Sequence, residues 1–216
     1  MTSATNPAPR TDRLLVGAFR EVRDRFARKE SVSLKHYLAP LGERSGIMGC
    51  AILAIPFLSP VSLGPLTIPA SALIALLAFR LLRRTEGAPL PDRFLRAPVP
   101  EAAHRFMARV LVRMVRLKRR FVRPRRSELV AGRRGEVICG CLLVGGAFLL
   151  AIPVPMLPLT NTFPALGIIL TAVGWVERDG LLTLLSVGIH AIGALVLGAV
   201  FGAALWAGTA VLQGAG

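Results

Sequence analysis

Three long stretches of the chain carry no charged side chain. Asp, Glu, Lys and Arg are absent from residues 46–79, 137–176 and 180–216. The charged residues lie in the intervening segments, 1–45, 80–136 and 177–179. Segregation on this scale is the hydropathy pattern of an integral membrane protein. We therefore predict an all-α integral membrane protein.

Proline and glycine interrupt the first two apolar stretches near their middles. A helix that crosses a bilayer needs about 20 residues, so residues 46–79 are too few for two full spans. Two short helices joined by a broken turn do fit. We predict such helices over residues 46–58, 69–83, 137–152 and 164–176.

Each pair of short helices is expected to form a re-entrant hairpin. Proline lacks an amide donor and cannot continue a helix past the preceding turn, but it suits the first turn of the next helix. The predicted helix breaks are at Pro56, Pro69, Pro153 and Pro164. Alternatively, these prolines kink two packed spans.

The two hairpins resemble each other in sequence. The letters "LAIP" at 53–56 recur at 150–153, and Thr67 to Ala70 is echoed by Thr162 to Ala165. Arg83 lies fourteen residues after Pro69, and Arg178 lies fourteen residues after Pro164. Paired, proline-broken segments in corresponding halves point to a binding site near the membrane midplane.

The basic segments predict the topology. Lys and Arg in short loops stay on the cytoplasmic side, which places the N-terminus in the cytoplasm and predicts that the chain crosses the membrane more than once. The chain is thereby divided into a basic N-terminal segment (1–45), a first hairpin (46–83) and an Arg-rich connector (84–136). A second hairpin (137–179) and a C-terminal transmembrane segment (180–216) follow.

The C-terminal stretch is long enough for one tilted span or for a tight hairpin. It contains the spacing Gly198-x-x-x-Gly202, which favours close contact between helices. That contact lies either within one subunit or between the two subunits of a homodimer.

Two basic segments have amphipathic patterns. Residues 11–29 place Leu15, Ala18, Phe19, Val22 and Phe26 on one helical face. This helix either lies on anionic lipid or packs on the protein's own cytoplasmic side. Residues 101–122 mix apolar residues with arginines, and we expect them to contact anionic lipid headgroups rather than nucleic acid.

The sequence gives no sign of an enzyme. It has no P-loop, no dinucleotide-binding glycine pattern, no H-E-x-x-H and no G-x-S-x-G. Cys50, Cys139 and Cys141 lie in apolar segments without zinc-like partners, so we interpret them as small buried residues. We predict no catalytic residue, no metal site and no cofactor.

The candidate site is polar and lies at the hairpin tips and exits. Hydroxyl and amide side chains at the predicted tips include Ser59, Thr67, Asn161 and Thr162. Arg83, Glu177, Arg178 and Asp179 follow the second helix of each hairpin. The three charges at 177–179 are either a cap between two helices or the rim of a cavity. His190 is the ionisable residue within the last apolar stretch, either buried and hydrogen-bonded or a proton relay.

Several stretches resemble the ExoD family of exopolysaccharide-synthesis membrane proteins. They are "VSLKHYLAPLGERSGIMGCAILAIPFLSP", "LLRRTEGAPLPDRFL" and "NTFPALGIILTAVGWVERDGLLTLLSVG". The most specific part joins Asn161 and Pro164 to Glu177-Arg178-Asp179-Gly180. The resemblance implies a bacterial inner-membrane protein connected with exopolysaccharide production, and it implies no chemical mechanism.

Two classes of function are consistent with these patterns. The first is a transporter- or flippase-like factor that acts on an anionic lipid-linked polysaccharide precursor or an ion. The second is a non-transporting adaptor that regulates a polysaccharide assembly complex. Transport requires polar groups that converge at the hairpin tips, whereas an adaptor can have dry, packed tips.

Overall fold

The structure, a computed structural model, is helical throughout the residues that it describes. These are residues 10–39, 45–58, 67–83, 95–96, 98–99, 101, 104–110, 113, 126–152 and 160–214. Within them the β-type pairing is a single isolated bridge between Ser33 and Pro98. The all-helical prediction is therefore confirmed for the described part of the chain.

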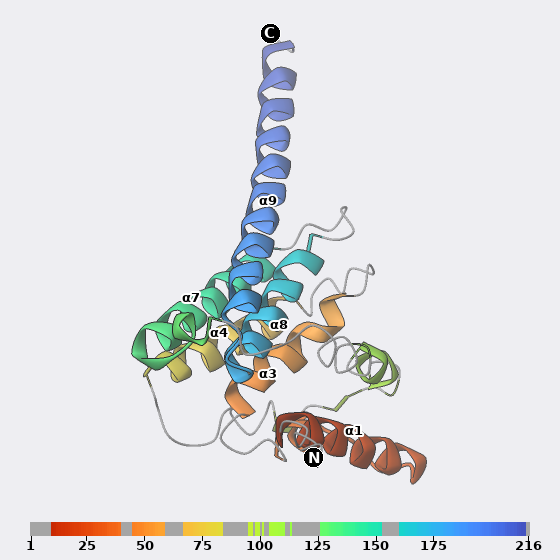
Figure 1. Ribbon diagram of the computed structural model, residues 1–216. Helices are drawn as coiled ribbons and strands as arrows, with labels where there is room; N and C mark the ends of the chain where they lie inside the picture. The colour runs from red at the N-terminus through yellow and green to blue at the C-terminus, as the bar shows by residue number, and fades with distance from the viewer. Residues whose placement is uncertain are drawn as a thin grey trace.

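Four helices, grouped together in Figure 1, form a closed ring of pairwise contacts. They are α3 (Ser45–Ala54), α4 (Thr67–Arg83), α7 (Gly132–Ala151) and α8 (Thr162–Val176). Helix α3 contacts α4 and α8, and α7 contacts the same two helices. Fully buried side chains of α4, α7 and α8 pack inside the ring, namely Ile74, Leu77, Leu143, Leu150, Ile168 and Ile169. Each helix of one predicted hairpin thus packs against its own partner and against one helix of the other hairpin.

The helices lie close to their predicted positions. Helix α3 continues into the 3-10 helix η2 (Ile55–Leu58), which contains Pro56. Pro69 and Pro164 are each the third residue of their helix, α4 and α8. Proline is tolerated there because the first amides of a helix have no partner within it. Pro153 and Ser59 lie outside the described residues, and the re-entrant path of the chain stays a prediction.

Helix α7 begins earlier than the sequence indicates. It starts at Gly132 rather than near residue 137, and its first turns carry Arg133, Arg134 and Glu136. Charged side chains can continue a helix beyond its apolar part, so a boundary set by charge alone places the start of the helix too late.

Helix α9 (Gly180–Gly214) is one continuous helix of 35 residues. This settles the alternatives for the C-terminal stretch in favour of one helix rather than a tight hairpin. Its first half packs on α8 and α7. Its second half extends away from the other helices (Figure 1), and Leu205 and Trp206 there are 72% and 75% exposed.

Within the described residues, two helices are long and apolar enough to cross a membrane. These are α7 and residues 180–207 of α9. Residues 46–58, which comprise most of α3 and η2, and helix α8 are apolar but shorter. Residues 46–58 and helix α8 are therefore shorter than the roughly 20 residues of a full span, as the predicted short helices over 46–58 and 164–176 require.

Helices α1 (Arg10–Ala27) and α2 (Leu34–Leu38) form a separate layer at the opposite end from the tip of α9 (Figure 1). Ala18, Phe19 and Val22 of α1 are buried. The apolar face of α1 therefore packs on the protein itself, which decides between the two alternatives for this amphipathic helix. The side chain of Leu15 lies outside the described residues.

Candidate functional site

Two of the predicted helix breaks, those at Pro56 and Pro164, meet in the folded chain. Thr162 at the start of α8 donates a hydrogen bond from Oγ1 to the carbonyl oxygen of Phe57 in η2, at 3.5 Å. Helix α8 also contacts η2 more widely. Two segments about a hundred residues apart thus share one junction, where the predicted tip residues Asn161 and Thr162 lie together.

Asn161 has an unusual role at this junction. It is the N-cap of α8, yet its side chain makes no capping hydrogen bond. An N-cap asparagine normally accepts a bond from one of the next two or three backbone amides. The Oδ1 atom is buried and has no hydrogen-bond partner among the described residues. The other described tip residue, Thr67, is buried at the start of α4.

The predicted charged exit of α8 is a compact corner between two helices. Arg178 has a positive φ of 54°. The amide of Asp179 donates to the Gly174 carbonyl at 2.8 Å, and that of Arg178 to the Trp175 carbonyl at 3.2 Å. This pair of bonds is a Schellman motif, which satisfies the last carbonyls of a helix.

Asp179 also begins the next helix. Its Oδ1 accepts hydrogen bonds from the amides of Leu181 and Leu182 at 3.0 and 3.3 Å. One residue therefore closes α8 and caps α9, and its side chain is only 2% exposed. Arg178 is exposed and Glu177 half-buried. The capping role of this cluster is thereby established, while its role at the rim of a cavity stays a prediction.

Arg83 occupies the corresponding end of α4. Its guanidinium carbon lies 4.4 Å from the centroid of the Phe79 ring, a cation–π contact on an exposed part of the helix. Nearby, Arg133 Nη1 donates to the carbonyl oxygen of Leu82 at 3.1 Å. A cation at the C-terminus of a helix is favourable because the helix dipole is negative there.

A line of polar side chains runs through the interface of α8 and α9. Thr171 Oγ1 lies 2.9 Å from Ser186 Oγ, and Ser186 donates to the Thr183 carbonyl at 2.6 Å. His190 Nδ1 lies 2.8 Å from the Ser186 carbonyl oxygen. The spacing of Asp179, Thr183, Ser186 and His190 puts them on one helical face, a pattern that the sequence contains but that we did not single out.

The His190 ring is enclosed by two glycines. A β-carbon at Gly146 of α7 would collide with Nε2, and one at Gly167 of α8 would lie 2.5 Å from Cε1. His190 is 8% exposed, and Nε2 has no hydrogen-bond partner among the described residues. One alternative from the sequence was a buried, hydrogen-bonded histidine. His190 is buried, and its Nδ1 has a hydrogen-bond partner whereas its Nε2 has none among the described residues.

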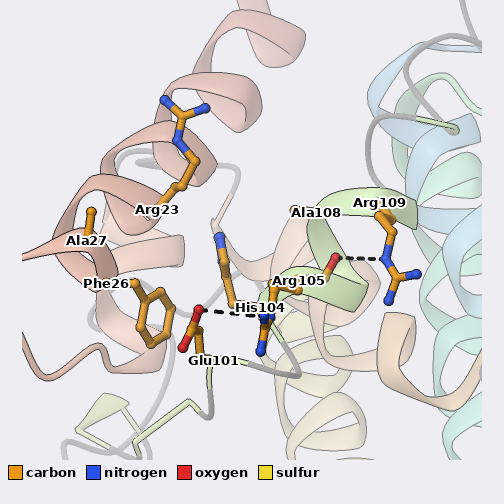
Figure 2. Close-up of a pocket in the computed structure, with 8 residues that line it drawn as sticks. All are labelled: Arg23, Phe26, Ala27, Glu101, His104, Arg105, Ala108 and Arg109. Atoms are coloured by element: carbon orange, nitrogen blue, oxygen red, sulfur yellow. Dashed lines mark hydrogen bonds and ion pairs between the residues drawn. The ribbon is translucent and has the colours of Figure 1, made fainter. Parts of the chain in front are cut away.

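A second candidate site lies between α1 and the helical residues 104–110. This cleft has a volume of about 790 Å³, and Figure 2 shows the side chains around it. It is lined by Arg23, Phe26, Ala27, Glu101, His104, Arg105, Ala108 and Arg109. The sequence left residues 11–29 open between lipid and the protein itself and favoured lipid headgroups for residues 101–122. It did not bring the two segments together, because nothing in the local pattern links residues 23–27 to residues 101–109.

Aromatic rings form the inner wall of this cleft. Tyr37 Oη lies 2.8 Å from His104 Nδ1, and the Phe26 and His104 ring centroids are 5.1 Å apart. Burial raises the pKa of Tyr37 above its usual value, so the phenol stays protonated. Burial has the largest effect on the pKa of His104 and lowers it. The negative charge of Glu101 raises this pKa and the positive charge of Arg23 lowers it, and the net result is a decrease. His104 is therefore neutral at pH 7.

Cysteines and metal ligands do not form a site in the described part of the chain. No group of three or more His, Cys, Asp or Glu side chains there is placed to hold a metal ion. Cys50 and Cys139 are buried as predicted, whereas Cys141 is exposed. Cys141 lies on an exposed face of α7, which its apolar neighbours in sequence could not reveal.

Comparison with known proteins places the chain in a family. The family model described as "Exopolysaccharide synthesis, ExoD" matches residues 18–199. The chain belongs to the ExoD family. The ExoD match runs from α1 to the middle of α9 and so includes the ring, both helix breaks and the charged corner.

Two relatives indicate how far the ExoD likeness extends. The chain is 31% identical to Protein ExoD of Rhizobium meliloti over 156 residues. That region is 72% of this chain and 64% of the Rhizobium protein, so less than two thirds of that protein is covered. An uncharacterized protein of Synechocystis sp. is 25% identical over 166 residues, 76% of this chain and 77% of that protein. No solved structure matches the chain.

Proposed function

We propose that this ExoD-family chain is a non-catalytic, multi-pass protein of the bacterial inner membrane that acts in exopolysaccharide synthesis. In this proposal it is a transporter- or flippase-like factor for an anionic lipid-linked intermediate or an ion. The family description and the relative from Rhizobium meliloti support the pathway. The two helices long and apolar enough to span a bilayer support the location.

One observation favours transport over a purely structural role. The two helix breaks meet at Thr162 and Phe57, and beside them the Oδ1 atom of Asn161 is buried with no partner among the described residues. A buried polar atom without a hydrogen bond costs about 1–3 kcal/mol. Non-helical backbone at membrane depth is tolerated where it is buried or lines a cavity. A ligand that donates to this amide would recover that energy.

The proposal is tested by Asn161→Leu, which keeps the bulk of the side chain and removes its polar atoms. We expect reduced exopolysaccharide in a deletion strain complemented with this variant, while the protein still reaches the membrane. Gln213→Leu is the matched control, because it makes the same chemical change at an exposed position near the end of α9.

A reconstituted assay separates transport from regulation. Vesicles would carry the purified protein and a prenyl phosphate lipid with a fluorophore that external dithionite bleaches. Transport predicts faster bleaching of the inner-leaflet lipid with the wild-type protein than with Asn161→Leu or Arg178→Gln. If both variants restore exopolysaccharide fully and the wild type does not accelerate bleaching, the adaptor function replaces transport.

A further inference from the structure

We propose that the cleft between α1 and residues 101–109 binds a phosphate group that carries a sugar. The choice of a sugar rests on the proposed role in exopolysaccharide synthesis. Phosphate binding depends on the cleft alone. This site is separate from the junction of the helix breaks, and its ligand is either a free sugar phosphate or the head of a lipid-linked one.

Three arginines line the cleft; Arg105 and Arg109 provide the anion-binding groups, whereas the Arg23 side chain points away from them and adds positive charge to the cleft wall (Figure 2). Arg23 comes from α1, and Arg105 and Arg109 are one helical turn apart on the helix that faces it (Figure 2). Guanidinium groups bind phosphate oxygens through paired, charge-assisted hydrogen bonds. A guanidinium has five N–H donors. Among the described residues, Arg23 forms an ion pair with Asp24 at 3.2 Å, and Arg105 forms one with Glu101 at 3.8 Å. Arg109 donates a hydrogen bond to the carbonyl oxygen of Arg105 at 3.4 Å.

His104 adds a neutral donor to the same cleft. Because the Tyr37 phenol keeps its proton, its O–H donates to His104 Nδ1 across the 2.8 Å contact. Neutral imidazole has one N–H, which is then on Nε2. The ring is 5% exposed and fixed between Phe19 and Phe26. A donor held in this way is preorganised, which reduces the entropy cost of binding.

The charge and volume of the cleft fit a sugar phosphate. Three arginines and one glutamate, with neutral His104, give a net charge of +2. A phosphate monoester carries about −1.5 to −2 at pH 7. The volume of about 790 Å³ lies within the usual range for small-molecule sites. Glu101 offers carboxylate oxygens that accept bonds from hydroxyl groups, and Phe26 offers an apolar ring face.

The first test measures binding of glucose 1-phosphate, inorganic phosphate and glucose to the purified full chain in detergent by calorimetry. We expect glucose 1-phosphate to bind most tightly, inorganic phosphate more weakly and glucose not measurably. Arg105→Gln/Arg109→Gln should weaken glucose 1-phosphate binding at least about tenfold, because charge-assisted hydrogen bonds are lost. Arg28→Gln/Arg134→Gln removes the same charge from exposed positions outside the cleft and should leave binding unchanged.

Two further measurements separate the remaining alternatives. The double variant Tyr37→Phe/His104→Phe removes the donor together with its buried partner, so that no polar atom is left unpaired, and should weaken binding with little change in the melting temperature. Competition by farnesyl phosphate that is stronger than competition by inorganic phosphate would identify the lipid-linked head as the ligand, whereas equal or weaker competition would favour a free sugar phosphate.

Two outcomes would overturn the inference. If glucose 1-phosphate does not bind, or binds equally to Arg105→Gln/Arg109→Gln, the cleft is not a phosphate site. If inorganic phosphate binds as tightly as glucose 1-phosphate, the sugar component is wrong. Either result leaves the lipid-bleaching assay of Asn161→Leu unaffected, so a failure here is distinct from a failure of the transport proposal.

Discussion

His190 lies directly against Gly146, so that a β-carbon on residue 146 would collide with the imidazole Nε2 atom. The contact joins α9 to α7, and the same ring also touches Gly167 of α8. Three helices therefore meet around one side chain, and the absence of side chains at two glycines creates the space for it.

Gly146→Ala is expected to destabilise the fold. Overpacking of a filled core costs about 1–3 kcal/mol, and alanine's better helix propensity returns at most about 1 kcal/mol. The neighbouring Gly145→Ala is the control, because nothing lies within 4 Å of its added β-carbon. Thermal unfolding in detergent should show a lower melting temperature for Gly146→Ala and an equal or higher one for Gly145→Ala. Equal melting temperatures would show that His190 moves away without cost.

Asp179→Ala should loosen the corner between α8 and α9. Loss of an N-cap side chain costs about 0.5–2 kcal/mol, and this carboxylate accepts two backbone amides. Asp179→Asn retains an acceptor oxygen and should recover most of the stability. Hydrogen exchange at the amides of residues 181 and 182 would report the change directly, and unchanged protection in Asp179→Ala would contradict the capping role.

Most ends of the ring helices could be predicted from sequence because proline and charge mark them; the start of α7 is the exception. The prediction of short helices over 46–58 and 164–176 rested on such local signals, and η2 and α8 end where it places them. The polar line beside His190 was missed because isolated Thr and Ser residues carry little signal in an apolar run. The cleft was missed for another reason. It depends on packing between residues far apart in the chain, which no local pattern encodes.

Acidification should loosen the layer of α1, α2 and residues 104–110. His104 has a lowered pKa in the folded chain because it is buried. Its contribution to stability is therefore complete above the unfolded histidine pKa of about 6.5 and is lost as the pH falls through the folded value. Unfolding measured between about pH 8 and pH 5 should show this loss in the wild type and not in His104→Phe. A slope that persists in the variant would assign the pH dependence to another group.

The burial of Tyr37 also has a spectroscopic consequence. It is the only tyrosine in the sequence, so tyrosinate absorbance reports this residue alone. Since burial raises its pKa, the folded protein should show little tyrosinate at about pH 11, where a free tyrosine of pKa about 10 is mostly ionised. Denaturant should restore ordinary titration. Ionisation near pH 10 in the folded protein would contradict the burial.

The proposed topology is tested at Ser127, an exposed residue in η4 (Ser127–Leu129). Ser127→Cys would be made with Cys141→Ser, because Cys141 is the exposed native thiol among the three cysteines. A membrane-impermeant maleimide should label inside-out vesicles and not intact cells whose outer membrane has been permeabilised. Labelling of those cells would place η4 on the periplasmic side and overturn the predicted orientation.

The exposed half of α9 is expected to lie in lipid. Trp206 is 75% exposed, and Trp175→Phe leaves it as the single tryptophan of the chain. Its fluorescence in reconstituted vesicles should be quenched strongly by brominated acyl chains and weakly by aqueous iodide. The opposite pattern would show that this half of the helix projects into water.

The corner at Asp179 also sets the rotational phase of α9. Since Asp179 completes α8 and caps α9 at once, no spare linker residue separates the two helices. One inserted residue would turn α9 by about 100° relative to α8, and Thr183, Ser186 and His190 would leave the interface together. Relatives that keep this interface should therefore vary here by substitution and not by changes in length. An insertion or deletion at this corner would mark a chain that has lost the histidine contact between its helices.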